Sequence, residues 1–285
     1  MKSIVYILIA VFAGGIFASV LPKVNVNGEQ KITLQSTNDP SSIELLNKSG
    51  EIILSRLQDY GIKNVDVAVQ LNTSDLVVSL DKRKDVNSIK NLFLNKGVVE
   101  FYEVFDDPEM IQNHGGLEEL KALIDMDDNR NGILGSCSED QKPAVEQFLA
   151  MHYVSKPGKG ICFAWSQFPN KNGKYDLYML HPESSMNYSN IQESLVVSDD
   201  SNNKNALLIE FDETGTIVWQ ELTRKNIGKP IAIVMDNFVI TAPRVMDEIT
   251  EGLCLITGNF SMEEIKYMQS LIANDILPLN FEITQ

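Results

Sequence analysis

The sequence predicts an α+β fold: an N-terminal membrane helix, then two ferredoxin-like βαββαβ modules with an inserted head region between them. Three observations lead to this prediction. Residues 4–21 are almost wholly apolar. Residues 24–105 and 201–285 each alternate strand-length apolar runs with amphipathic helical stretches, which is the order of a ferredoxin-like sandwich. Residues 106–200 are less regular and rich in polar turns, as an inserted region with mobile loops would be.

The apolar segment at the start determines the expected compartment. Ile4 to Leu21 lies between Lys2 and Lys23, and as a helix it spans about 27 Å, slightly less than the roughly 30 Å hydrocarbon core of a bilayer. Residues 1–23 are therefore predicted to be an uncleaved signal anchor, with a cleaved signal peptide or a plain buried segment as alternatives. Lys2 on the short side predicts that residues 23–285 lie outside the cytoplasm.

Composition limits the classes of partner. Lys and Arg number 24 against 39 Asp and Glu, so the net charge is −15, and the chain is expected to repel nucleic acid. Three cysteines are few for a disulfide scaffold. Cys162 and Cys254 lie in apolar runs and are expected to be buried, whereas Cys137 lies in a polar loop and is expected to be accessible. One disulfide with a leftover thiol is the alternative.

Capping signals mark the elements of the first module, residues 24–105. Ser41 and Glu44 form an S-x-x-E capping box, so a helix is predicted from there to Tyr60, with Gly61 ending it. The other predicted elements are strands at Lys31–Gln35, Val65–Val69 and Leu76–Leu80, a helix at Val86–Asn95, and a strand at Val98–Phe105 that closes the module.

The second module, residues 201–285, reads in a similar order with one extra strand. Asp236-Asn237 suits a two-residue hairpin turn, and Ser261 with Glu264 forms another capping box. Strands are predicted at Ala206–Phe211, Ile231–Met235, Phe238–Ile240, Leu253–Ile256 and Leu279–Ile283. Helices are predicted at Thr216–Lys225 and from Met262.

Motifs for metal binding and catalysis are weak. Residues 127–132 imitate the start of a calcium loop, but the twelfth position is Ser138 instead of a bidentate Glu, so an Asn/Gly-rich turn is favoured. His114, His152 and His181 are isolated, and no nucleophile elbow, P-loop or dinucleotide fingerprint occurs. The paired carboxylates Glu118-Glu119 and Glu263-Glu264 point apart on their helices. We therefore predict no catalytic residue, metal site or cofactor.

Three aromatic residues are candidates for binding an extended peptide. Trp165, Trp219 and Phe238 could line a groove, although core or hairpin packing is the favoured alternative for each. No partner-binding residue is predicted beyond this candidate set.

The last eighty residues resemble the first periplasmic domain of SecD, an auxiliary subunit of the Sec protein-export machinery. The family pattern is a threonine, then N-x-G-K, D-G, S-A-P, I-x-G, F-T-x-E-E-A and G-x-L-P. The matching positions are Thr223, Asn226, Gly228, Lys229, Asp236, Ala242-Pro243, Ile256, Gly258, Phe260, Ser261, Glu263-Glu264 and Leu277-Pro278. Four positions depart from the pattern: Asn237, Thr241, Ile265 and Asp275 replace Gly, Ser, Ala and Gly.

Two further stretches extend the resemblance to about half of the chain. Residues 54–62 resemble the family's R-x-x-x-x-G-V helix end, and residues 96–101 its A-x-L-E-F strand. Residues 147–151 and 163–166 look like the insertion in one subgroup of SecD and SecDF proteins.

The resemblance implies a membrane-tethered domain that assists Sec-dependent export. It would bind an unfolded preprotein or Sec translocon subunits such as SecF or a SecY-type channel, by strand addition at a sheet edge. Because residues 4–21 are the one long apolar stretch in this sequence, we expect no proton-coupled motor within it. The alternatives are an extracytoplasmic hydrolase of unrecognised type and a SecD remnant without an export role.

Overall fold

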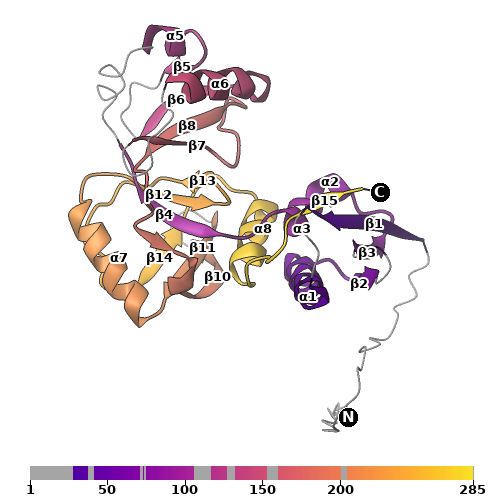
Figure 1. The fold of residues 1–285 in the computed structure, drawn as a ribbon. Helices are drawn as coiled ribbons and strands as arrows, with labels where there is room; N and C mark the ends of the chain where they lie inside the picture. Colours follow the sequence, from indigo (N-terminus) through magenta and orange to yellow (C-terminus); the bar gives the residue numbers. More distant parts are fainter. Residues whose placement is uncertain are drawn as a thin grey trace.

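The structure is a computed structural model that describes residues 28–37, 42–70, 73, 75–105, 117–126, 132–152, 160–199 and 204–284. The predicted membrane segment, residues 4–21, lies outside these ranges. Within the described ranges, none of the helices has the length and apolar character needed to cross a bilayer. Four antiparallel sheets form the described fold, and Figure 1 shows them as three groups of elements.

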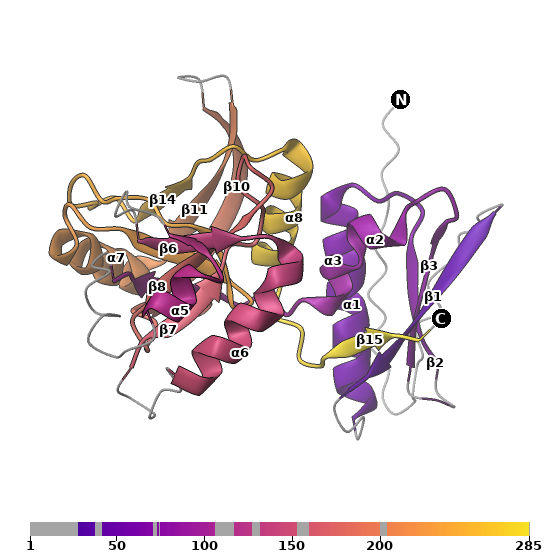
Figure 2. The ribbon, with the colours of Figure 1, turned by 90° about the horizontal axis from the view of Figure 1, so that it is seen from above.

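The first group is a four-stranded antiparallel sheet, here named the base sheet, with strand order β15-β1-β3-β2. Helices α1, α2 and α3 lie together beside the sheet (Figure 2). The elements are β1 (Glu29–Ser36), α1 (Ile43–Tyr60), β2 (Asp66–Gln70), β3 (Asp75–Asp81), α2 (Val86–Ile89), α3 (Asn91–Leu94) and β15 (Phe281–Ile283). The predicted helix Val86–Asn95 is thus two short turns, with Ile89, Leu92 and Phe93 buried.

Helix α1 begins one residue later than predicted. Ser42 is the N-cap, and its side chain accepts a hydrogen bond from the backbone N–H of Leu45 at 3.3 Å. Ser41 lies outside the described residues. Gly61 ends the helix in the left-handed conformation, with φ of 102°, as the sequence predicts.

The prediction that Val98–Phe105 closes the first module is wrong. Strand β4 (Val99–Glu103) pairs with β12 and β9, and β15 takes the place beside β1. Phe101 explains the preference, because it is fully buried and its ring contacts Phe211 and Trp219 at centroid distances of 5.5 and 5.4 Å. An alternating pattern shows that a segment is a strand, but it does not name the partner strand.

The second group contains two sheets, here named the central sheets, with strand orders β13-β12-β4-β9 and β10-β11-β14. The predicted second module is therefore divided between these sheets and the base sheet. The elements are β9 (Met186–Asn187), η2 (Tyr188–Asn190), β10 (Ile191–Asp199), β11 (Lys204–Phe211), α7 (Glu213–Lys225), β12 (Ile231–Met235), β13 (Phe238–Thr241), β14 (Leu253–Ile256) and α8 (Met262–Ile272).

Local signals of the central region are confirmed. Asp236 and Asn237 have φ of 49° and 71°, as a hairpin turn between β12 and β13 requires. Ser261 and Glu264 make both hydrogen bonds of the capping box that opens α8.

The third group is a four-stranded sheet, here named the inserted sheet, with strand order β5-β6-β8-β7. Residues 106–200 were predicted to be less regular, but part of this range forms a four-stranded sheet. Strands β9 and β10, from the same range, belong to the central sheets. The elements are α5 (Leu117–Lys121), β5 (Asp125–Met126), β6 (Ile133–Cys137), η1 (Glu139–Gln141), α6 (Lys142–His152), β7 (Cys162–Trp165) and β8 (Tyr175–Leu180). Two apolar clusters, one including α6 residues and the other including β12 and β13 residues, pack against this sheet.

A buried arginine joins the base sheet to the central region. Arg56 lies on α1 and has no exposed surface. Its guanidinium donates hydrogen bonds of 2.6–3.4 Å to the backbone carbonyls of Leu92, Asn95, Lys96 and Asp275. Burial lowers the pKa of Arg56 to about 10, so the guanidinium stays charged at neutral pH. The carbonyls lie on or next to the two segments that cross between the units, one before β4 and one before β15.

The β12–β13 turn holds the first crossing segment from its other side. The Asp236 carboxylate accepts hydrogen bonds from the N–H groups of Gly97 and Val98 at 2.9–3.1 Å. Gly97 has φ of 84°, and a Cβ placed there would lie 2.5 Å from Nη2 of Arg56. Glycine is therefore required by both conformation and space.

Gly97→Ala is expected to lower the free energy of unfolding by about 2–4 kcal/mol, because the methyl group strains φ and displaces Arg56 from its carbonyls. Gly61→Ala is the matched control, since Gly61 also has positive φ but no neighbouring atom lies within 4 Å of the place that an alanine methyl group would take. The control should cost about 1 kcal/mol. Urea denaturation of the full chain measures both, and equal losses would contradict the proposed clash.

Candidate functional site

The candidate site is a groove along β7, the edge strand of the inserted sheet. Among the described strands, β7 pairs with β8 on one side alone. The strand is followed by Ser166, which forms a parallel bridge to Val239, and the N–H of Gln167 donates to the carbonyl of Val239 at 2.8 Å. Strand β13 thereby closes one end of the groove.

Two walls rise beside this edge. Helix α6 contributes Glu146, Leu149 and Ala150, whose i, i+3 and i+4 spacing places them on one helical face. The β12–β13 turn contributes Asn237 and Phe238. The groove has a volume of about 420 Å³ and is lined by Glu146, Leu149, Ala150, Ile161, Cys162, Phe163, Ala164, Trp165, Leu177, Asn237 and Phe238. An edge strand beside a helix, with an apolar lining, suits an added extended strand.

The three aromatic candidates separate in the structure. Trp165 and Phe238 both line the groove, with Trp165 6% exposed and Phe238 38% exposed. Trp219 instead packs in the central core, where its Nε1 donates to the carbonyl of Leu253 at 3.2 Å. For Trp219 the core alternative is therefore correct.

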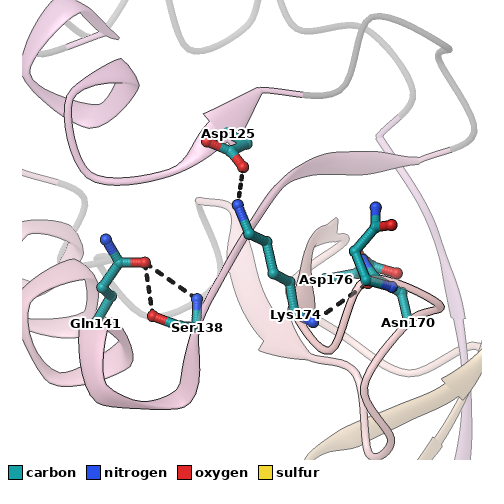
Figure 3. Close-up of polar contacts among 7 residues, drawn as sticks. Asp125, Ser138, Gln141, Asn170, Lys174 and Asp176 are labelled. Carbon is teal, nitrogen blue, oxygen red and sulfur yellow. Dashed lines mark hydrogen bonds and ion pairs between the residues drawn. The ribbon is translucent and has the colours of Figure 1, made fainter.

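Polar contacts fix the connection that follows β7 (Figure 3). The side-chain amide of Asn170 donates to the Asp176 carboxylate at 2.7 Å, and the N–H of Asp176 donates to Oγ of Ser166 at 3.0 Å. Lys174 forms an ion pair with Asp125 of β5. These contacts tie both ends of the β7–β8 connection and one outer strand together, so the groove lies on a supported sheet.

The cysteine prediction was wrong for two of three residues. Cys137 is buried at 1% exposure, whereas Cys162 is exposed on the groove. Cys254 is buried as predicted, and all three are free thiols. Cys162 lies in an apolar run but on an edge strand, while Cys137 ends β6 facing the cluster beneath α6. Local sequence does not separate these two environments.

The histidines and the calcium-like loop form no common site. His181 stacks on Phe105 and His152 on Phe148, while His114 and residues 127–131 lie outside the described residues. Ser138, the twelfth position of that loop, forms a capping box with Gln141 (Figure 3). No three metal-ligating side chains gather within the part of the chain that the structure describes. The sequence predicts no cofactor, and that remains a prediction.

The paired carboxylates have structural partners. Glu118 forms an ion pair with Lys121 at 2.8 Å, and Glu264 caps α8 through Ser261. The groove residues that sequence reasoning missed are Glu146, Leu149, Ala150, Ile161, Cys162, Phe163, Ala164, Leu177 and Asn237. The amphipathic spacing within residues 146–150 was a usable signal for one wall, but nothing local indicated that the β12–β13 turn forms the other.

Cys162 is expected to be alkylated by iodoacetamide well before Cys137 and Cys254, because it alone is exposed. Burial, and to a smaller extent the Glu100 carboxylate, raises the pKa of the Cys162 thiol, and burial raises that of Cys254 to about 12. The alkylation rate at Cys162 should therefore still rise with pH above about 8.5, the value of a free cysteine. Peptide mapping by mass spectrometry from pH 7 to 10 measures this, and faster labelling of Cys137 would contradict the burial pattern.

Comparison with known proteins gives a consistent result. Residues 165–279 match the family model described as SecDF, P1 head subdomain. The protein translocase subunit SecD of Leptotrichia buccalis is 33% identical over 116 residues, which are 41% of this chain and 27% of that protein. The SecD subunit of Rhodothermus marinus is 24% identical over 91% of this chain and 50% of its own length.

A solved structure has the same fold. The structure described as SecDF in a super-membrane-facing form superposes with a TM-score of 0.57 and 21% identity, covering 94% of this chain and 32% of that one. The chain thus spans between about a quarter and half of the length of the proteins compared here.

Proposed function

We propose that this chain, whose residues 165–279 match the SecDF P1 head family model, is a SecD/SecDF-type periplasmic domain that assists Sec-dependent export by binding an unfolded polypeptide in the groove along β7. The observation that supports the proposal most is the groove between two walls beside the edge strand β7, with Trp165 and Phe238 on the lining. Main-chain hydrogen bonds to a strand edge tolerate many sequences, as an export factor requires.

The groove suits weak and reversible binding. Its volume of about 420 Å³ holds a few side chains, and the strand beside it is four residues long. A small contact of this kind does not retain a passing polypeptide. Docking of a Sec subunit on the same edge would use the same backbone groups.

We also propose a location and a division into domains. Residues 4–21 would tether the domain to the inner membrane, with the bulk in the periplasm, or the domain would be released there after cleavage. The order β15-β1-β3-β2, antiparallel throughout, supports a ferredoxin-like base in which β15 is the fourth strand. The inserted sheet would then be the part of the head that presents the groove.

An extended ten-residue peptide with alternating leucines should slow the alkylation of Cys162 in the full chain, because the bound strand covers that thiol. Ala150→Trp fills the groove from an exposed position on α6 and should weaken binding by about tenfold. Ala144→Trp is the matched control, since Ala144 is exposed on the same helix but does not line the groove.

The readout is the alkylation rate of Cys162 as a function of peptide concentration. Protection that is lost in Ala150→Trp and kept in Ala144→Trp would support the groove. Absence of protection at millimolar peptide would overturn the peptide-binding proposal. Protection by purified Sec subunits alone would instead assign the edge to docking.

A further inference from the structure

A further cavity lies between the end of α8 and the edge strand β10. Its volume is about 530 Å³. In Figure 1 and Figure 2, α8 stands between β10 and α1. The lining includes five consecutive residues of β10, 191–195. Because consecutive side chains of a strand point to opposite faces, such a run places the cavity along the edge of the strand and not over one face.

This edge of β10 has no pairing strand within the described ranges. Strand β10 is hydrogen-bonded to β11 alone and lies at the end of the strand order β10-β11-β14. In the same part of the chain, the backbone groups of residues 192–195 have no hydrogen bond outside the β10–β11 pair. The edge can therefore accept an extended segment as a fourth strand.

The cavity is negatively charged. Asp59, Glu193 and Asp275 line it from three parts of the chain, and the described lining contains no lysine or arginine. The last turns of α1 and α8 both contribute to the lining, and neither turn contains a basic residue. Because a helix C-terminus carries a partial negative charge, the two helix ends add to the carboxylates. Lys48 compensates one of them, through an ion pair with Asp275 at 3.3 Å.

The other cation near the cavity is already balanced. Arg56 lies against Gly97, which belongs to the lining, and its charge interacts with the Asp236 carboxylate. Asp59 and Glu193 have no ion-pair partner among the described residues, and both are exposed to solvent. Two carboxylates beside the open edge are therefore left for a cation that comes from outside.

We propose that this cavity receives an arginine side chain on an extended segment of a partner polypeptide that pairs with β10. The alkyl stem packs on Ile272 and Ile276, and the guanidinium lies between Asp59 and Glu193. Tyr188, which is 48% exposed, adds an aromatic ring to the lining. A guanidinium suits this set better than an ammonium, because it donates in several directions and stacks on aromatic rings.

Ser194 gives an independent indication of a donor-rich ligand. It lines the cavity and is 4% exposed, and its Oγ has no hydrogen-bond partner in the described part of the chain. A buried hydroxyl without a partner costs free energy. Its oxygen can accept a hydrogen bond, so a ligand with several N–H donors removes this cost. The site lies on a different sheet from the β7 groove and does not depend on the proposed function.

Three extended ten-residue peptides that differ at one central position test the proposal. That position is arginine, lysine or citrulline, and a neutral dye reports binding to the full chain by fluorescence anisotropy. The arginine peptide should bind about tenfold more tightly than the citrulline peptide, because two exposed ion pairs are each weak, with lysine in between. Added salt should reduce the difference. N-methylation of the five central residues should abolish binding, because it removes the backbone donors.

Asp59→Asn combined with Glu193→Gln is the decisive variant. The amide oxygen at position 59 can still accept the 2.8 Å hydrogen bond from the Asn274 side chain. This variant should bind the arginine and citrulline peptides equally, and an unchanged order of cysteine alkylation would show that it is folded. Glu51→Gln is the matched control and should keep the difference, since Glu51 is exposed on α1 but does not line the cavity. Ala150→Trp, which fills the β7 groove, should leave every affinity unchanged.

Each other outcome overturns the proposal in a recognisable way. Equal affinities for arginine and citrulline in the original chain would refute the cation site, and full binding of the N-methylated peptide would refute pairing with β10. A difference that persists in the double variant would assign it to the general negative charge of the chain. Loss of binding in Ala150→Trp would place the peptides in the β7 groove.

Two results would remove the site altogether. Binding of none of the peptides would refute it, while protection of Cys162 would still decide separately on the β7 groove. A dimer of the chain alone that excludes the arginine peptide, measured by analytical ultracentrifugation, would assign the edge of β10 to a second copy of the chain.

Discussion

The guanidinium of Arg56 is the interaction on which the arrangement of the units depends. Burying a charged group costs free energy unless its donors are largely satisfied, and here backbone carbonyls from both crossing segments accept hydrogen bonds from Nη1 and Nη2, while Nε has no partner among the described residues. The Asp236 carboxylate holds the first segment from the opposite side. The base sheet and the central sheets therefore share one polar junction, and the geometry of each crossing segment is set by the other.

The groove is a consequence of how the inserted sheet is packed. One face carries α6 and the other meets the β12–β13 hairpin, so both walls come from elements that also bury apolar side chains. β7 lies at the edge of that sheet, and β13 meets its end at Ser166. The groove is formed by the same packing that stabilises the sheet. The groove lining and the apolar core therefore share side chains, among them Leu149, Ile161, Trp165 and Leu177.

Short sequence signals predicted the caps and turns of the fold. The pairing of strands that are distant in sequence could not be predicted from them. Gly61, the Asp236-Asn237 turn and the Ser261 capping box each depend on local backbone chemistry, and the structure has all three. The pairing of β4 with β12 and of β15 with β1 depends on burial against distant residues. Phe238 and Trp165 were candidates from the sequence, but Glu146 needed the sheet to place it beside them.

The pairing of β1 with β15 also determines the order in which the parts of the chain can form. Leu34 lies opposite Ile283, so this contact closes a loop that contains nearly all of the described chain. On a ribosome, the base sheet lacks its edge strand until Phe281–Ile283 has emerged, whereas the central and inserted sheets can form earlier. Contacts of such long range slow folding, because the entropy of loop closure is lost before the pairing is gained. Among the described sheets, the base is thus the last to be completed, and a nascent chain stalled before residue 281 would expose the edge of β1 to other strands.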